Sequence, residues 1–163
     1  MKLKLMMLFL LISVKSVFAA QLTDFRSDGC SLSPDGVWAH CCVEHDLAYW
    51  QGGPRTERIA ADARLRQCIA HYDPTIADIY FNAVRTAGSE IEMGIPSLAY
   101  FRWGYGWKNR KAYKALSTSE RNLAKLLLMK YTPDYIQNIL SDELALDKAQ
   151  VTYVLNRVQV MAQ

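Results

Sequence analysis

The side chains that could do chemistry gather in one short segment, which reads Cys-Cys-Val-Glu-His-Asp-Leu-Ala-Tyr over residues 41–49. On a helix, His45, Asp46 and Tyr49 share one face, because residues three and four apart lie on the same side. Burying an unpaired His and Asp costs several kcal/mol, so this face requires polar partners or a cleft. A neutral imidazole with its ordinary pKa of about 6.5 can take a proton from water. His45 is therefore a candidate general base.

A histidine base that activates water needs two further groups. A carboxylate behind the ring fixes its tautomer, and a cation near the reacting carbonyl holds the developing oxyanion. Asp46 points about 100° away from His45 on a helix, so it is better placed to bind a cation than to support the ring. The supporting carboxylate is expected from the next helix, where Asp62 stands six residues before Cys68.

The cysteines predict disulfides. Four are present, at positions 30, 41, 42 and 68, and an even number in an exported chain is typical of two bridges. Adjacent Cys41 and Cys42 would have to close a strained ring, so Cys30 is expected to pair with one of them and Cys68 with the other. An alternative is a zinc cluster of His40, Cys41, Cys42, His45 and Cys68, although no C-x₂-C…H-x₃-H order is present.

Export is predicted from residues 1–19, which have the features of a secretory signal peptide. A basic start precedes an apolar run over residues 5–14, which is too short to span a bilayer, and modest or small residues stand at positions 17 and 19. We expect cleavage after Ala19 and a secreted or periplasmic protein. Cleavage removes three lysines and leaves 16 basic against 16 acidic residues. The charge therefore gives no indication of a nucleic-acid partner.

The expected fold is all-α. A loop rich in Asp, Gly, Ser and Pro over residues 24–36 precedes helices that we expect near residues 37–51, 55–71, 75–91, 117–129, 132 onward and 146–160. Ser117 and Glu120 have the spacing of a capping box, and Pro133 suits a first helical position. We assign residues 20–115 to one domain and residues 116–163 to a helical extension packed on it.

The Cys-Cys-x-x-His-Asp-x-x-Tyr pattern of residues 41–49 resembles the active-site helix of secreted phospholipase A2. The spacing of Asp62 and Cys68 is similar to that of the family's second helix, and the resemblance covers residues 28–70. It implies a disulfide-linked antiparallel helix pair, with the pairing Cys41–Cys68 and Cys30–Cys42. It also implies hydrolysis of the sn-2 ester of glycerophospholipids at a membrane surface.

The resemblance assigns roles to individual residues. His45 would be the base, and Asp62 and Tyr49 would orient it. Calcium (Ca2+) would bind Asp46 and the backbone carbonyls of Gly29 and Ser31. The family has a Cys-Gly-x-Gly-Gly loop, whereas the loop of this chain reads Asp-Gly-Cys-Ser-Leu-Ser-Pro-Asp-Gly over residues 28–36 and retains only its cysteine in place.

Several alternatives stay open at this level. His45 could be a structural histidine, and Asp62 could be a solvated residue paired with Arg58 or Arg66 four positions away. Glu44 is expected at the surface. The leading rival to an enzyme is a non-catalytic, disulfide-rich lipid- or protein-binding module, and a third candidate is hydrolysis of another acyl ester.

An aromatic and basic stretch over residues 99–114 has two interpretations. Trp103, Trp107 and Lys108 form a candidate lipid interface, because Trp favours the headgroup level and Lys attracts anionic lipid. Alternatively, the aromatic rings pack into the core.

Overall fold

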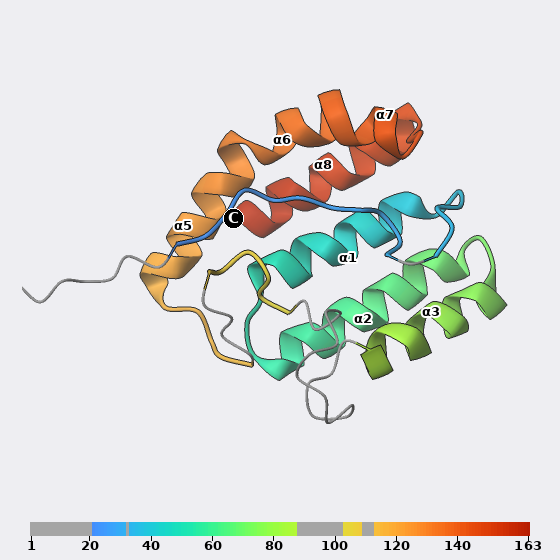
Figure 1. The fold of residues 1–163 in the computed structure, drawn as a ribbon, viewed down its shortest axis with the longest axis horizontal. Helices are drawn as coiled ribbons and strands as arrows, with labels where there is room; N and C mark the ends of the chain where they lie inside the picture. Colours follow the sequence, from blue (N-terminus) through green and yellow to red (C-terminus); the bar gives the residue numbers. More distant parts are fainter. Residues whose placement is uncertain (1–20, 32, 88–102, 109–112) are drawn as a thin grey trace, which may run out of the picture.

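The computed structural model describes residues 21–31, 33–87, 103–108 and 113–163. Within these ranges all regular structure is helical, and the one extended contact is an isolated antiparallel bridge between Leu22 and Trp107. The all-α prediction is therefore confirmed for the described part of the chain (Figure 1). The expected signal peptide lies outside these residues and stays a prediction.

Three helices form the N-terminal half: α1 (Ala39–Gln51), α2 (Arg55–Ala70) and α3 (Pro74–Ala87). Only Gly52, Gly53 and Pro54 separate α1 from α2. Gly52 has a φ of 69°, which favours glycine and lets the chain reverse. The two helices run antiparallel, because a disulfide joins Cys41 near the start of α1 to Cys68 near the end of α2. The third helix was expected to reach residue 91, and its last expected residues lie outside the described ranges.

The C-terminal half consists of α5 (Thr118–Lys130), α6 (Thr132–Tyr135), the π-helix η1 (Ile136–Leu140), α7 (Ser141–Glu143) and α8 (Lys148–Ala162). The predicted capping box is present, since Ser117 and Glu120 exchange hydrogen bonds at the start of α5. Asp147 and Gln150 form a second capping box at the start of α8. Both helices therefore begin where their backbone N–H groups are satisfied.

Helix α1 lies between α2 on one side and α8 on the other (Figure 1). Its apolar side chains share a core cluster with the C-terminal helices, and the buried members are Phe25, Val43, Leu47, Trp50, Ala124, Leu128, Ile136, Leu140, Val154 and Val158. The face of α1 that carries His45 and Tyr49 is turned toward α2. The C-terminal helices therefore support α1 from behind.

Two of the three residues proposed as a lipid interface are buried, so that prediction is wrong for them. Trp103 is 1% exposed and donates its indole N–H to the carbonyl of Gly53, and Trp107 is 3% exposed and donates to the carbonyl of Gln51. Their indoles satisfy carbonyls at and just beyond the end of α1, which is the core-packing alternative. Lys108 is exposed.

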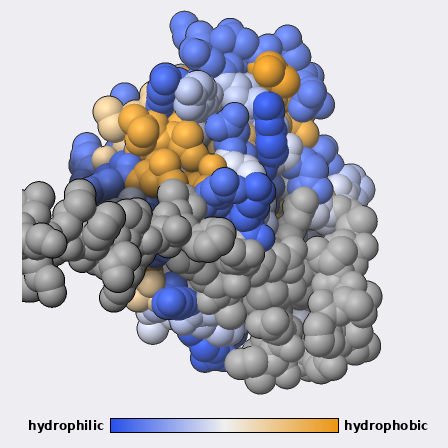
Figure 2. All heavy atoms as spheres, turned by 60° about the vertical axis from the view of Figure 1, so that its left-hand side comes forward, coloured by the Kyte–Doolittle hydropathy of each residue, from blue (hydrophilic) through white to orange (hydrophobic). Residues whose placement is uncertain are grey.

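On the face that Figure 2 presents, the described surface is mostly hydrophilic, with one larger apolar patch and a smaller apolar area apart from it. Large apolar side chains that are exposed include Leu126 and Met129 of α5 and Val160 of α8. No helix among the described residues is both long enough and apolar enough to cross a bilayer.

Candidate active site

Two disulfides hold the start of α1 in place. One joins Cys30 of the preceding loop to Cys42, and the other joins Cys41 to Cys68. This is the pairing that the resemblance implied, and it is confirmed. The first bridge fixes the loop to α1, and the second fixes α1 to α2, so residues on the facing sides of the two helices are held in register.

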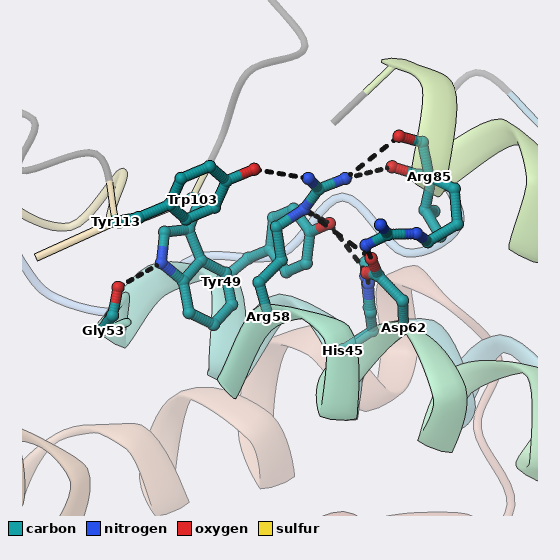
Figure 3. A network of polar contacts seen from close by, with 9 residues as sticks. His45, Tyr49, Gly53, Arg58, Asp62, Arg85, Trp103 and Tyr113 are labelled. Carbon is teal, nitrogen blue, oxygen red and sulfur yellow. Dashed lines mark hydrogen bonds and ion pairs between the residues drawn. The ribbon is translucent and has the colours of Figure 1, made fainter. Parts of the chain in front are cut away.

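His45 and Asp62 meet across these two helices (Figure 3). His45 Nε2 lies 2.9 Å from Asp62 Oδ1. An ionised carboxylate can only accept hydrogen bonds, so Nε2 donates and the lone pair of the neutral ring lies on Nδ1. That nitrogen forms no hydrogen bond with any residue that the structure describes. The ring is thus oriented by a carboxylate on one side and carries its basic nitrogen on the other, as general-base catalysis requires.

Tyr49 extends this pair by one helical turn. Its hydroxyl donates to Asp62 Oδ1 at 2.8 Å, and its ring lies 4.2 Å from the His45 ring, centroid to centroid. Burial, together with the nearby Asp62 carboxylate, raises the pKa of the Tyr49 phenol well above its ordinary value. The phenol therefore keeps its proton and remains a donor.

Asp62 is completely buried, with 0% of its surface exposed. Burial alone would raise the pKa of this carboxyl group. The hydrogen bond and charge of His45, followed by the contributions of Tyr49 and Arg58, outweigh burial and lower the pKa below its ordinary value. Asp62 therefore stays ionised behind His45.

Two arginines surround the same carboxylate. Arg85 Nη1 donates to Asp62 Oδ2 at 3.0 Å, and Arg58 Nε lies 3.6 Å from that oxygen. Arg66 points elsewhere and pairs with Asp78 at 2.6 Å. The alternative of a solvated Asp62 is therefore wrong. The four-residue spacing of Arg58 and Asp62 was a signal for one of these contacts, whereas sequence spacing gave none for Arg85.

Arg58 connects three parts of the chain (Figure 3). It is fully buried, and its Nε donates to the Tyr49 hydroxyl at 2.9 Å. Its terminal nitrogens donate to the Tyr113 hydroxyl at 2.5 Å and to the carbonyls of Val84 and Arg85 at 2.8 and 3.3 Å. Arg58 therefore holds the last turn of α3 against α1 and α2.

The loop before α1 meets Asp46 through a serine that the sequence did not single out. Ser27 Oγ donates to Asp46 Oδ2 at 2.7 Å and accepts from the backbone N–H of Gly29 at 3.1 Å. Gly29 has a φ of 72°, and its carbonyl accepts from the backbone N–H of Ser31 at 3.1 Å. The loop thus places the Ser27 hydroxyl against the carboxylate. Hydroxyl and carboxylate oxygens are hard donors, the type that calcium prefers.

His40, Cys41 and Cys68 also lie together, with their nitrogen and sulfur atoms within 4.8 Å of one another. Both sulfurs belong to the disulfide, so no thiolate is offered and the zinc alternative is wrong for this structure. His40 is instead a packed residue, in edge contact with the rings of Tyr72 and Tyr153. Burial lowers its pKa.

Glu44 was expected at the surface, and this prediction is wrong. It is 6% exposed and accepts from Arg157 Nε at 2.8 Å and from the Tyr153 hydroxyl, both on α8. Burial and the Glu44 contact raise the pKa of Tyr153 to about 12. Glu44 therefore anchors α8 to the back of α1, next to His45 in sequence but on another side of the helix.

Comparison with known proteins gave no match to a protein-family model, to a curated protein or to a solved structure. The assignment of a function therefore depends on the geometry of these residues.

Proposed function

We propose that this protein is a phospholipase A2-like carboxylic ester hydrolase that cleaves the sn-2 acyl ester of glycerophospholipids. The observation that carries the proposal is the His45–Asp62 contact of 2.9 Å across a helix pair that a disulfide joins. A buried, ionised Asp with a Tyr donor on the same oxygen is the environment that keeps an imidazole in one tautomer.

In the proposed reaction, His45 Nδ1 takes a proton from a water molecule, and the resulting hydroxide attacks the ester carbonyl carbon. Asp62 stabilises the imidazolium that forms, and Tyr49 holds the carboxylate in place. When the tetrahedral intermediate collapses, the imidazolium returns its proton to the leaving alcohol oxygen. The products are a free fatty acid and a lysophospholipid, and the enzyme regains its neutral histidine.

Calcium is part of the proposal, and it would supply positive charge beside the developing oxyanion when bound. Asp46 would hold it together with the backbone carbonyls of Gly29 and Ser31. Ser27 orients Asp46 and ties it to the backbone at Gly29. The atypical loop sequence is compatible with this role because the ligands would be backbone oxygens.

Vesicles of a phosphatidylcholine with different acyl chains at sn-1 and sn-2 test the proposal. We expect the mature protein to release the sn-2 chain in the presence of calcium, and a chelator to stop the release. Asp46→Asn should abolish the calcium response, whereas Asp134→Asn, a change at an exposed carboxylate, should leave it unchanged.

Absence of fatty-acid release by the wild-type protein would overturn the proposed activity. Binding to the vesicles without release would favour the non-catalytic module instead. Release that a chelator does not affect would leave the histidine mechanism in place and remove calcium from it.

A further inference from the structure

We propose that Arg85 is a positioning residue of this site, which acts from α3 by holding the second oxygen of Asp62 and thereby fixing the His45 ring. This inference rests on the proposed function and extends its machinery to a third helix. Arg85 Nη1 donates to Asp62 Oδ2 at 3.0 Å, on the side of the carboxylate away from His45.

Both oxygens of Asp62 accept hydrogen bonds. Oδ1 accepts from His45 and Tyr49, and Oδ2 accepts from Arg85. The contacts to Oδ1 alone would let the carboxylate turn about its own bond to Cβ. A donor on Oδ2 opposes that rotation, so the direction of Oδ1 toward His45 depends on Arg85.

The position of Arg85 is itself fixed by the chain. Arg58, which is fully buried on α2, donates to the carbonyls of Val84 and Arg85 and holds the last turn of α3. Side chains of Arg or Lys at a helix C-terminus commonly satisfy its last carbonyls. Here the guanidinium is that of Arg58, which belongs to α2. Arg58 therefore fixes the end of α3, and Arg85 at that end binds Asp62.

Neutralising the charge of Asp62 does not by itself explain why two guanidinium groups, those of Arg58 and Arg85, lie beside its carboxylate. Arg58 already lies 3.6 Å from Asp62 Oδ2, and one cation is sufficient to balance one carboxylate. Arg85 is 22% exposed, so it could have been solvated without a partner. Its contact with the buried oxygen is therefore better explained by orientation.

The test compares Arg85→Gln and Arg85→Lys with Arg66→Gln. Arg66 forms the exposed Arg66–Asp78 pair between the same two helices, so its loss removes a helix–helix contact without touching Asp62. We expect Arg85→Gln to lower kcat for fatty-acid release about 10- to 100-fold with little change in KM, because misplaced catalytic groups lose rate rather than binding. Arg85→Lys should recover part of the rate, and Arg66→Gln should match the wild-type protein.

A second readout is independent of activity. The chain has three histidines, so ¹⁵N-labelled imidazoles can be assigned with a His45→Gln spectrum. At a pH of about 8, where an ordinary imidazole is neutral, the wild-type His45 should show the Nε2–H tautomer, and Arg85→Gln should show a mixture. If Arg85→Gln unfolds the chain, Arg85→Lys carries the same comparison with an intermediate change.

An unchanged His45 tautomer in a folded Arg85 variant overturns the inference, whatever happens to the rate. An unchanged kcat in Arg85→Gln overturns it as well. If the wild-type protein releases no fatty acid, the proposed function fails, and the tautomer comparison alone decides the role of Arg85.

Discussion

Among the single residues of the site, Asp62 is the one to which the other polar side chains bind. Its carboxylate receives hydrogen bonds from His45, Tyr49 and Arg85. Burial would raise its pKa, but His45, Tyr49 and Arg58 outweigh burial and hold the pKa below the ordinary value. A carboxyl group with a lowered folded-state pKa stabilises the fold at every pH above its unfolded pKa of about 3.9. The stabilisation is lost as the pH falls through the folded-state value.

Asp62→Asn should therefore lower the free energy of unfolding at neutral pH by about 3–5 kcal/mol, because it leaves two guanidinium groups without their anion. Urea unfolding monitored by circular dichroism measures this free energy. The difference from the wild-type protein should shrink as the pH falls from about 3.9 through the lower folded-state pKa of Asp62, because the wild-type carboxylate is then protonated as well. Asp78→Asn, at the exposed Arg66–Asp78 pair, should cost less than about 1 kcal/mol. Equal losses from the two variants at neutral pH would refute this account of Asp62.

The sequence identified the residues on the facing sides of α1 and α2 because short-range spacing is enough to place them. His45 and Tyr49 are one turn apart, and the helix pair is closed by cysteines that are themselves visible in the sequence. Arg85 and Ser27 were missed because their contacts depend on how α3 and the loop pack. No periodic pattern encodes such contacts.

The Cys41–Cys68 disulfide acts at the scale of helices. It joins the two helices that carry His45 and Asp62, and it closes a loop across 27 positions of sequence. A bridge of this length restricts the unfolded chain and typically contributes about 2–4 kcal/mol.

Replacing both Cys41 and Cys68 by Ala should lower the free energy of unfolding by about 2–4 kcal/mol. It should also lower fatty-acid release under conditions where the variant is still folded, because the register of α1 and α2 loosens. Urea unfolding and release assays on the same preparation measure the two effects. Full activity in a folded variant would show that packing alone positions the dyad.

The helices themselves were largely predictable. Gly52, Gly53 and Pro54 mark the turn between α1 and α2, and the capping box at Ser117 marks the start of α5. The role of Glu44 was not predictable, because its burial depends on α8, which lies more than one hundred positions further along the chain.

At the scale of the whole molecule, the C-terminal helices stabilise the fold by packing against α1. Leu128 of α5 and Val154 of α8 are completely buried in the same cluster as Val43 and Leu47 of α1. The prediction that Trp103 and Trp107 face a lipid surface was wrong, because the sequence alone does not distinguish a Trp at a membrane surface from a Trp in a core. Packing against the end of α1 decides between the two.

Leu128→Ala should lower the free energy of unfolding by about 2–5 kcal/mol, because it opens a cavity in this shared core. Leu126→Ala is the matched control on the same helix. Its side chain is 56% exposed, and the change should stay within about 0.5 kcal/mol. Thermal or urea unfolding measures both variants, and a small effect of Leu128→Ala would mean that the C-terminal helices do not support α1.

The central claim is that His45, oriented by Asp62, activates water. It is tested most directly by the initial rate of sn-2 fatty-acid release for His45→Gln and His71→Gln. His71 is exposed, and its ring hydrogen-bonds the carbonyl of Gln67 in the preceding helical turn, so its replacement controls for the loss of an imidazole. We predict a loss of about 10²–10⁴-fold for His45→Gln and a wild-type rate for His71→Gln. A wild-type rate in a folded His45→Gln protein would contradict the claim.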